Sequence, residues 1–217
     1  MTESYVYLDE FRRDIYRMVP ADGKVIGSIG CGRAPTEARL VAEGREVHGV
    51  DVSAEAIETA RTRLTSARVI DPNQSPFEDD SLDGLILADV LEHLPMAWEK
   101  LISFSRAVRP DGWVVISVPN NRYVEALIPL MFKGDWPESP MGIFDQTHLQ
   151  VMTHKRLNRW CLAAGLRLDA EFDCYDYRFV RRNIYRGLNL ATFRVLKAFL
   201  TFEVQARYRR EPVARSA

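Results

Sequence analysis

The stretch Val25-Ile-Gly-Ser-Ile-Gly-Cys-Gly-Arg-Ala34 decides the fold of this chain. A short apolar run, Lys24–Ile29, leads directly into Gly30-Cys31-Gly32, and Pro35 then stands where a helix can begin. Glycines let the backbone approach a ligand closely, and a helix N-terminus favours a negatively charged group. The pattern predicts a buried strand, a tight turn and a ligand-facing helix start. A tight turn without a ligand is the alternative.

Further strand-like and helix-like segments alternate along the chain on both sides of this motif. The expected strands are Val47–Val52, Ala67–Ile70, Gly84–Ala88 and Trp113–Val118, and the expected helices are Leu8–Val19, Ala54–Leu64 and Met96–Val108. Ser53 is a plausible N-cap, and Pro110-Asp111-Gly112 reads as a turn. Strands separated by helices imply a parallel sheet covered on both faces. We therefore predict an α/β fold with a Rossmann-like, mostly parallel sheet in a single domain, 1–217.

The second half of the chain is less regular. Residues 120–153 follow Pro119 and contain Pro129, Pro137 and Pro140, and we expect an insertion after the fifth strand that forms a lid above the sheet. Lys155–Ala164 reads as a helix that ends at Gly165, and Asn183–Ala198 reads as another. Phe202–Tyr208 is expected to close the sheet, so that residues 178–217 would form a basic helix, strand and tail.

Acidic residues follow the predicted strands at their carboxyl ends, where open α/β sheets bind their ligands. Asp51 ends the second strand, Asp71 ends the third, and Ala88-Asp89-Val90-Leu91-Glu92-His93 follows the fourth. A carboxylate at the position of Asp51 can accept two hydrogen bonds from a ribose diol, each contributing about 1.5–3 kcal/mol. Capping of the next helix is the alternative for Asp51, although Ser53 already supplies a cap.

These motifs together resemble the class I methyltransferases, which use S-adenosylmethionine. The stretches that carry the resemblance run from about residue 5 to about residue 208 and are VIGSIGCGRA (25–34), VHGVDVS (47–53), DPNQSPFEDDSLD (71–83), ADVLEHL (88–94), VRPDGWVVISVPN (108–120) and DQTHLQVMT (145–153). Within this group the chain is most similar to small bacterial enzymes that accompany glycosyltransferases and sugar-modifying pathways. The motif set is specific to the cofactor and leaves the acceptor open.

The resemblance assigns ten residues to the cofactor. They are Gly30, Cys31 and Gly32 at the methionine part, Asp51 at the ribose with Val52 against the adenine, Asp71 and Pro72 at the adenine amino group, and Ala88, Asp89 and Val90 at the sulfonium end. The chain departs from the family pattern at two positions. Ser28 stands where the family has an acidic residue, and Ala34 stands where it has a third glycine.

Methyl transfer to a hydroxyl benefits from a general base, and histidine is the best suited side chain near neutral pH. Of the four histidines, His148 is the first candidate and His93 the second, with Asp145 placed to orient His148. The alternative is that Asp145 and His148 only brace their loop. Three widely spaced cysteines without a CxxC pair predict no metal site and no disulfide framework, as in a reducing cytoplasm.

The net charge of −1 hides an asymmetry between the two parts of the chain. Residues 1–177 carry a net charge of −9, whereas residues 178–217 carry +8. The acidic body disfavours nucleic acid as a partner. The basic amphipathic stretch Asn183–Phe202 predicts a peripheral membrane contact, a homodimer face or a helix packed on the sheet. We expect a cytoplasmic protein without a secretory signal, with peripheral contact at the inner membrane surface as a further expectation.

The leading hypothesis is O-methylation of a small or glycan-linked molecule. Aromatic and hydrogen-bonding residues in the insertion suit a sugar or another polar small molecule, and an ordinary surface loop is the alternative; they are Asn120, Asn121, Arg122, Tyr123, Lys133, Asp135 and Trp136. The resemblance to similar methyltransferases implies that Tyr5, Tyr7 and Arg13 close over the acceptor. The alternatives are N- or phenol-methylation of a small metabolite, and a non-catalytic binding protein that retains the fold. A dehydrogenase is weaker, because the third glycine of GxGxxG is missing.

Overall fold

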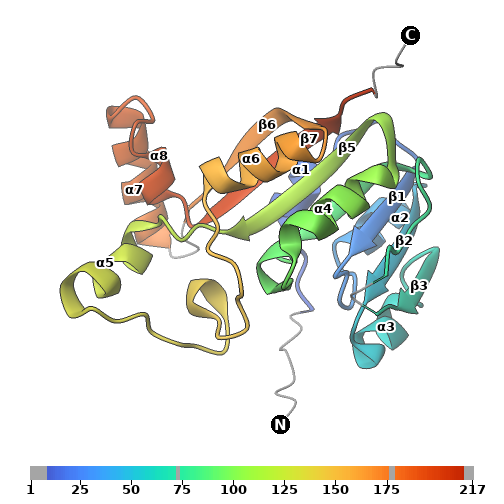
Figure 1. The fold of residues 1–217 in the computed structure, drawn as a ribbon, viewed down its shortest axis with the longest axis horizontal. Helices are drawn as coiled ribbons and strands as arrows, with labels where there is room; N and C mark the ends of the chain where they lie inside the picture. The colour runs from blue at the N-terminus through green and yellow to red at the C-terminus, as the bar shows by residue number, and fades with distance from the viewer. Residues whose placement is uncertain (1–8, 72–73, 176–178, 213–217) are drawn as a thin grey trace.

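The computed structural model describes residues 9–71, 74–175 and 179–212, and its centre is a seven-stranded sheet of order β3-β2-β1-β4-β5-β7-β6 (Figure 1). The strands are β1 (Val25–Ile29), β2 (Glu46–Asp51), β3 (Ser66–Val69), β4 (Leu82–Ala88), β5 (Val108–Pro119), β6 (Leu166–Cys174) and β7 (Glu203–Arg210). Strands β1 to β5 pair in parallel, and β7 runs antiparallel to both of its neighbours. The predicted α/β class and mostly parallel sheet are confirmed.

Helices cover both faces of the sheet because both faces of its central strands are apolar. One face packs against α1 (Arg13–Met18), α2 (Glu37–Ala42) and α3 (Ala54–Ala60), in a core that includes Met18, Leu40 and Ile57. The other packs against α4 (Ala97–Arg106) and α6 (His154–Ala163), through Leu101, Phe104 and Trp160. Burial of such side chains contributes about 1.5–3 kcal/mol each.

The register of the three central strands brings their carboxyl ends together. Ile29 at the end of β1 lies opposite Val50 of β2 on one side and Leu87 of β4 on the other. The chain order reverses between β1 and β4, and ligands of open α/β sheets bind at such a switch point. Gly30, Asp51 and Ala88 therefore lie at one edge of the sheet.

The helices that follow β5 and those that follow β6 form a separate small cluster beyond the end of the sheet, on the left of Figure 1. It contains α5 (Val124–Lys133), the short 3-10 helix η2 (Gly142–Phe144), α7 (Phe179–Ala191) and α8 (Lys197–Leu200). Tyr123, Ala126 and Ile143 form its core, against which Tyr185 and Phe202 pack. The predicted helix over 183–198 is thus two helices, since Phe193 and Arg194 have positive φ angles between them.

Two side chains expected to face a sugar instead hold this segment in place. The Asn120 amide is fully buried and donates to the carbonyl oxygens of Ala198 and Thr201, at 2.9 and 2.8 Å. The Asn121 side-chain oxygen accepts from the backbone N–H of Met152 at 2.6 Å. These side chains stabilise the insertion through hydrogen bonds to backbone groups, and the expectation that they contact a sugar is wrong. Tyr5 and Tyr7 lie outside the described residues.

Several basic residues in the C-terminal part of the chain form ion pairs within the molecule. Arg207 pairs with Asp169 at 2.5 Å, Arg209 with Asp22 at 2.7 Å, and Arg194 with Asp173 at 2.7 Å. The acidic body therefore supplies partners for the basic strand β7 and the turn before it.

Candidate cofactor and acceptor site

The turn after β1 leaves no room for a side chain at Gly30. Its φ angle is +69°, and a Cβ atom there would lie 2.6 Å from Cγ2 of Val90. The backbone N–H of Gly30 donates to the carbonyl oxygen of Val50 at 2.8 Å, which ties the turn to β2. The turn and the segment after β4 therefore pack closely against each other, and only glycine fits at this position.

Asp51 is buried and bridges two loops with its carboxylate. Its Oδ2 accepts from the backbone N–H of Gly32 at 2.8 Å, and its Oδ1 accepts from that of Ser53 at 2.9 Å. The cap of α3 is Ser53, whose hydroxyl accepts from the N–H of Ala56. A carboxylate oxygen can accept more than one hydrogen bond. Capping of α3 therefore does not explain Asp51.

The rest of the predicted adenine site is more open. Val52 is 58% exposed beside Asp51, and the side chain of Asp71 is also exposed. Pro72 lies outside the described residues. An apolar side chain that is exposed next to a buried carboxylate suits an aromatic base above a ribose.

A carboxylate that the sequence analysis did not single out lies next to Ser28. Glu37, the first residue of α2, is buried, and its Oε1 accepts from the Ser28 hydroxyl at 2.7 Å. Burial raises the pKa of this carboxyl group. The family's acidic residue is therefore replaced by a serine that hydrogen-bonds to an acid nine positions later. Its only signal in the sequence is an acidic residue in the first turn of a helix.

Asp89 is engaged by the protein itself. Its Oδ2 pairs with Nη1 of Arg12 at 2.6 Å, and its Oδ1 accepts from the Ser117 hydroxyl at 2.6 Å. Arg12 also pairs with Asp14 and with Glu203, at 2.7 and 2.9 Å. One guanidinium thus joins the N-terminal segment to the ends of β4 and β7. Burial and then the charge of Asp89 raise the pKa of Glu203 to about 7.

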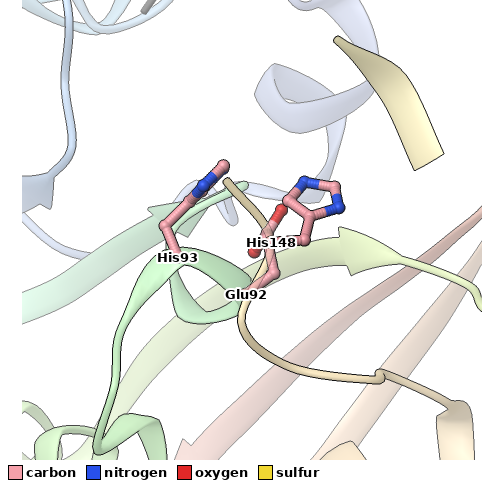
Figure 2. A group of neighbouring side chains, drawn as sticks. All are labelled: Glu92, His93 and His148. Atoms are coloured by element: carbon pink, nitrogen blue, oxygen red, sulfur yellow. The ribbon is translucent and has the colours of Figure 1, made fainter. Parts of the chain in front are cut away.

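The two predicted catalytic histidines lie side by side. The ring centroids of His93 and His148 are 4.8 Å apart with their planes inclined at 62°, although the residues are far apart in the chain (Figure 2). His93 belongs to the 3-10 helix η1 (Leu91–His93), which begins directly after Val90. The structure therefore places both rings next to the segment predicted to line the sulfonium.

Backbone hydrogen bonds hold the His148 loop against η1. The carbonyl oxygen of Glu92 accepts from the N–H groups of Leu149 and Gln150, at 2.7 and 3.2 Å. The Gln150 side chain donates to the carbonyl oxygens of Leu94 and Pro95. This docking gives the two rings a fixed relative position.

A chain of hydrogen bonds fixes the tautomer of His93. The Thr147 hydroxyl donates to Oδ1 of Asp145 at 2.7 Å, and the same hydroxyl oxygen lies 2.9 Å from Nδ1 of His93. A hydroxyl has one proton, so Thr147 must accept from His93, which then carries its proton on Nδ1. Asp145 was predicted to orient His148. The carbonyl oxygen of Asp145 accepts from the backbone N–H of His148 at 3.1 Å, and its carboxylate positions His93 through Thr147.

Burial makes both imidazoles weaker bases than usual. It lowers the pKa of His93, and burial together with the neighbouring His93 ring lowers the pKa of His148. Neutral rings present lone pairs to a proton or another electrophile. The carboxyl group of Glu92 lies below the two rings in Figure 2 and is 1% exposed. Burial and then the charge of Asp89 raise its pKa well above the usual value.

A family model described as a methyltransferase domain matches residues 7–171 of the chain. The chain belongs to this methyltransferase family. It is an S-adenosylmethionine-dependent enzyme, as the joint pattern at the strand ends predicts. The glycine turn and the buried Asp51 of the methyltransferase are the residues predicted to bind this cofactor.

Two curated relatives of the methyltransferase carry the same name. Ubiquinone biosynthesis O-methyltransferases from Aromatoleum aromaticum and Thiobacillus denitrificans are 27% and 28% identical to it, over 66% and 52% of this chain. The matched segments span 64% and 51% of those relatives' own lengths. Neither relative carries a name from sugar modification, so the predicted association with sugar pathways finds no support.

Solved structures share the fold at low sequence identity. A SAM-dependent methyltransferase from Archaeoglobus fulgidus has a TM-score of 0.59 and 19% identity, covering 86% of each chain. A putative methyltransferase of Haloferax volcanii, in complex with the Trm112 methyltransferase activator, has a TM-score of 0.64 and 17% identity, covering 91% of this chain and 87% of that one. These likenesses confirm the class I methyltransferase architecture.

Proposed function

We propose that the protein transfers a methyl group from S-adenosylmethionine to a hydroxyl oxygen of a small molecule. The observation that carries this proposal is the paired-histidine site beside the segment after β4, since a hydroxyl acceptor must lose a proton and two neutral imidazoles stand there. The names of the relatives support oxygen as the methylated atom.

For the cofactor, we assign to the chain the contacts that the family pattern implies. Gly30, Cys31 and Gly32 would lie against the methionine part, and Asp51 would accept from the ribose hydroxyls beside Val52. Ala88, Asp89 and Val90 would line the sulfonium end, with Asp89 held in place by Arg12. Asp71 would reach the adenine amino group. Bound S-adenosylmethionine supplies the methyl group.

We further assign the buried Ser28–Glu37 pair to the ammonium of the cofactor's amino acid part. A positive charge next to Glu37 would favour the ionised carboxylate, which burial alone disfavours. This places the missing acidic group of the motif on α2. The site would then keep a negative charge, although Ser28 stands where the family has an acidic residue.

For the proton of the acceptor, we propose His148 as the base and His93 as its alternative. His93 holds its proton on Nδ1 through Thr147 and so carries its lone pair on Nε2. The neutral state of both rings suits proton acceptance at neutral pH. Asp145 is a positioning residue in this scheme.

We propose a phenolic hydroxyl as the acceptor, ahead of a glycan-linked hydroxyl, because the relatives are named for O-methylation in ubiquinone biosynthesis. The exposed apolar side chains of α5, which include Met131 at 70% and Phe132 at 77%, give an apolar acceptor a surface to approach. We also propose a cytoplasmic enzyme whose α5 and α7 contact the membrane surface. A homodimer through the same face is the alternative.

The proposed cofactor site is tested by calorimetric titration with S-adenosylhomocysteine. The wild type should bind at micromolar concentration, and Asp51→Asn should weaken binding by at least about 10-fold, because one charged hydrogen bond contributes about 1.5–3 kcal/mol. Asp79→Asn, which changes an exposed aspartate between β3 and β4, serves as the control. Absence of binding by the folded wild type would support the non-catalytic alternative.

A further inference from the structure

Three side chains beside the proposed acceptor position converge around one point. They are Glu92 and His93 of η1 and His148 of the loop docked on it (Figure 2). One potential ligand atom of each residue lies within 4.8 Å of those of the other two. Ligand atoms bound to one ion at about 2.1 Å are about 3–3.5 Å apart. Small side-chain rotations would therefore bring all three onto a single ion.

One oxygen of the Glu92 carboxylate lacks a hydrogen-bond partner among the described residues. Glu92 is 1% exposed, and its Oε2 makes no hydrogen bond to any residue that the structure describes. The same is true of Nδ1 of His148 within the described part of the chain. Buried polar atoms almost always have a partner, so an orphaned carboxylate oxygen beside two imidazoles points to an absent ligand.

The hydrogen bond to His93 has the form that metal-bound histidines take. A histidine that binds a metal through one ring nitrogen usually donates the other N–H to an oxygen, which fixes its orientation. Nδ1 of His93 donates to Thr147, which donates to Asp145. Nε2 is therefore the ring nitrogen that would bind an ion.

We propose that Glu92, His93 and His148 bind a divalent transition metal ion of the Zn²⁺ type, with open coordination positions toward the acceptor. Two imidazoles and one carboxylate are a ligand set that zinc and related ions favour, and three protein ligands leave a position for substrate. The sequence prediction that the chain has no metal site would then be wrong.

A second group of possible ligands is less suited to an ion. Asp14, Cys174 and Glu203 also lie within 4.8 Å of one another. Both carboxylates already pair with Arg12, and both accept from Gln205. The guanidinium supplies the positive charge there, whereas no cation among the described residues pairs with Glu92.

The role of the ion rests on the proposed function. A hydroxyl oxygen bound to a divalent cation loses its proton more readily. The acceptor would release that proton to solvent, its oxygen would form the bond to the methyl carbon, and the electron pair of the broken C–S bond would stay on sulfur. His93 and His148 would then act as ligands, and neither would be required as a base.

The test is a titration of ZnCl2 into the chelator-treated, full-length protein, with CoCl2 as a coloured substitute. We expect one ion per chain, with a Kd below about 10 μM. At 100-fold excess over Kd, the ion should raise the Tm by about 5–10 °C. Glu92→Gln and His148→Gln should each weaken binding at least 10-fold, and MgCl2 should compete poorly.

Two control variants separate this cluster from other metal-binding groups. His154→Gln removes a partly buried histidine outside the cluster, and Cys174→Ser removes the thiol of the second group. Both should bind Zn²⁺ as the wild type does. If Glu92→Gln fails to fold, His148→Gln decides, because its side chain is only partly buried.

Absence of stoichiometric binding by the folded wild type would overturn the proposal. So would binding that survives both cluster variants or is lost in Cys174→Ser. Titration of the metal-free protein with S-adenosylhomocysteine tests the proposed function separately, since the cofactor residues lie outside the metal cluster.

Discussion

Glu37 carries a buried carboxylate whose partner, Ser28, is 2.7 Å away. If this pair holds the cofactor's ammonium, Glu37→Gln should weaken the binding of S-adenosylhomocysteine about 10- to 100-fold, because a charge-assisted hydrogen bond is lost. Binding of 5′-methylthioadenosine, which lacks the amino acid part, should remain unchanged. Isothermal titration of both ligands measures the two effects.

The difference between the two ligands is the control in this experiment. An equal loss for both would show that Glu37 only supports the turn around Gly30, and the assignment to the ammonium would fail. Glu43→Gln, at the C-terminal end of the same helix, removes an equal charge away from Ser28. It should affect neither ligand.

Among single residues, the sequence predicted those whose place follows from where a strand ends or a helix begins. Asp51 lies where a parallel strand ends, and Ser53 caps α3 as expected. Glu37 and Glu92 escaped prediction because their significance depends on burial. A glutamate in the first turn of a helix is common on a surface, and only the packed structure shows that these two carboxylates are hidden from water.

The strand β7 depends on a charge balance around its first residue. Glu203 is half-buried beside Arg12, Asp14 and Asp89, and its pKa is about 7, against about 4.5 in the unfolded chain. Between these pH values the native state keeps a proton that the unfolded chain releases. The free energy of unfolding therefore falls as the pH rises through this window and loses nothing more from this group above about pH 7.

Glu203→Gln should remove that slope. Between about pH 5 and pH 7.5 the wild type should lose about 1–3 kcal/mol more of its unfolding free energy than the variant does. Urea denaturation at both pH values measures the difference. Glu211→Gln, an exposed glutamate just after β7, should leave the slope unchanged. A wild-type stability that rises over this range would contradict the raised pKa.

At the scale of elements, periodicity predicted the parallel core but missed one edge strand. β6 alternates apolar side chains at Leu166, Leu168, Ala170, Phe172 and Cys174, so a period of two was present in the sequence. The strand was missed because polar residues alternate with these side chains and because the segment directly follows Gly165, as a loop would. The expected turn at 110–112 lies within β5. There the pairing of β5 with β4 shifts its register, because Leu82 pairs with Val108 whereas Gly84 pairs with Trp113.

At the scale of the whole molecule, α5 and α7 form an exposed end that is joined by polar contacts. Glu125 of α5 accepts from the Tyr185 hydroxyl of α7 at 2.7 Å and pairs with Arg181. Large apolar side chains are exposed on both helices and the following turn, namely Ile128, Leu130, Met131, Phe132, Ile184, Leu188, Leu190 and Phe193. No helix in the described part of the chain is long and apolar enough to cross a membrane.

This end of the molecule should bind vesicles that contain anionic lipid. Arg182 and Arg186 lie on the exposed surface of α7, and each basic residue near an anionic surface contributes about 1 kcal/mol. The double variant Arg182→Gln/Arg186→Gln should therefore bind about 30-fold more weakly in a co-sedimentation assay. Arg159→Gln/Arg167→Gln removes the same charge from α6 and β6 and should bind like the wild type.

An equal loss of vesicle binding in both double variants would indicate attraction by overall charge. Absence of vesicle binding, with a dimer in light scattering, would assign the apolar end to a second copy of the chain, since exposed apolar patches of this kind mark either a membrane or a protein contact.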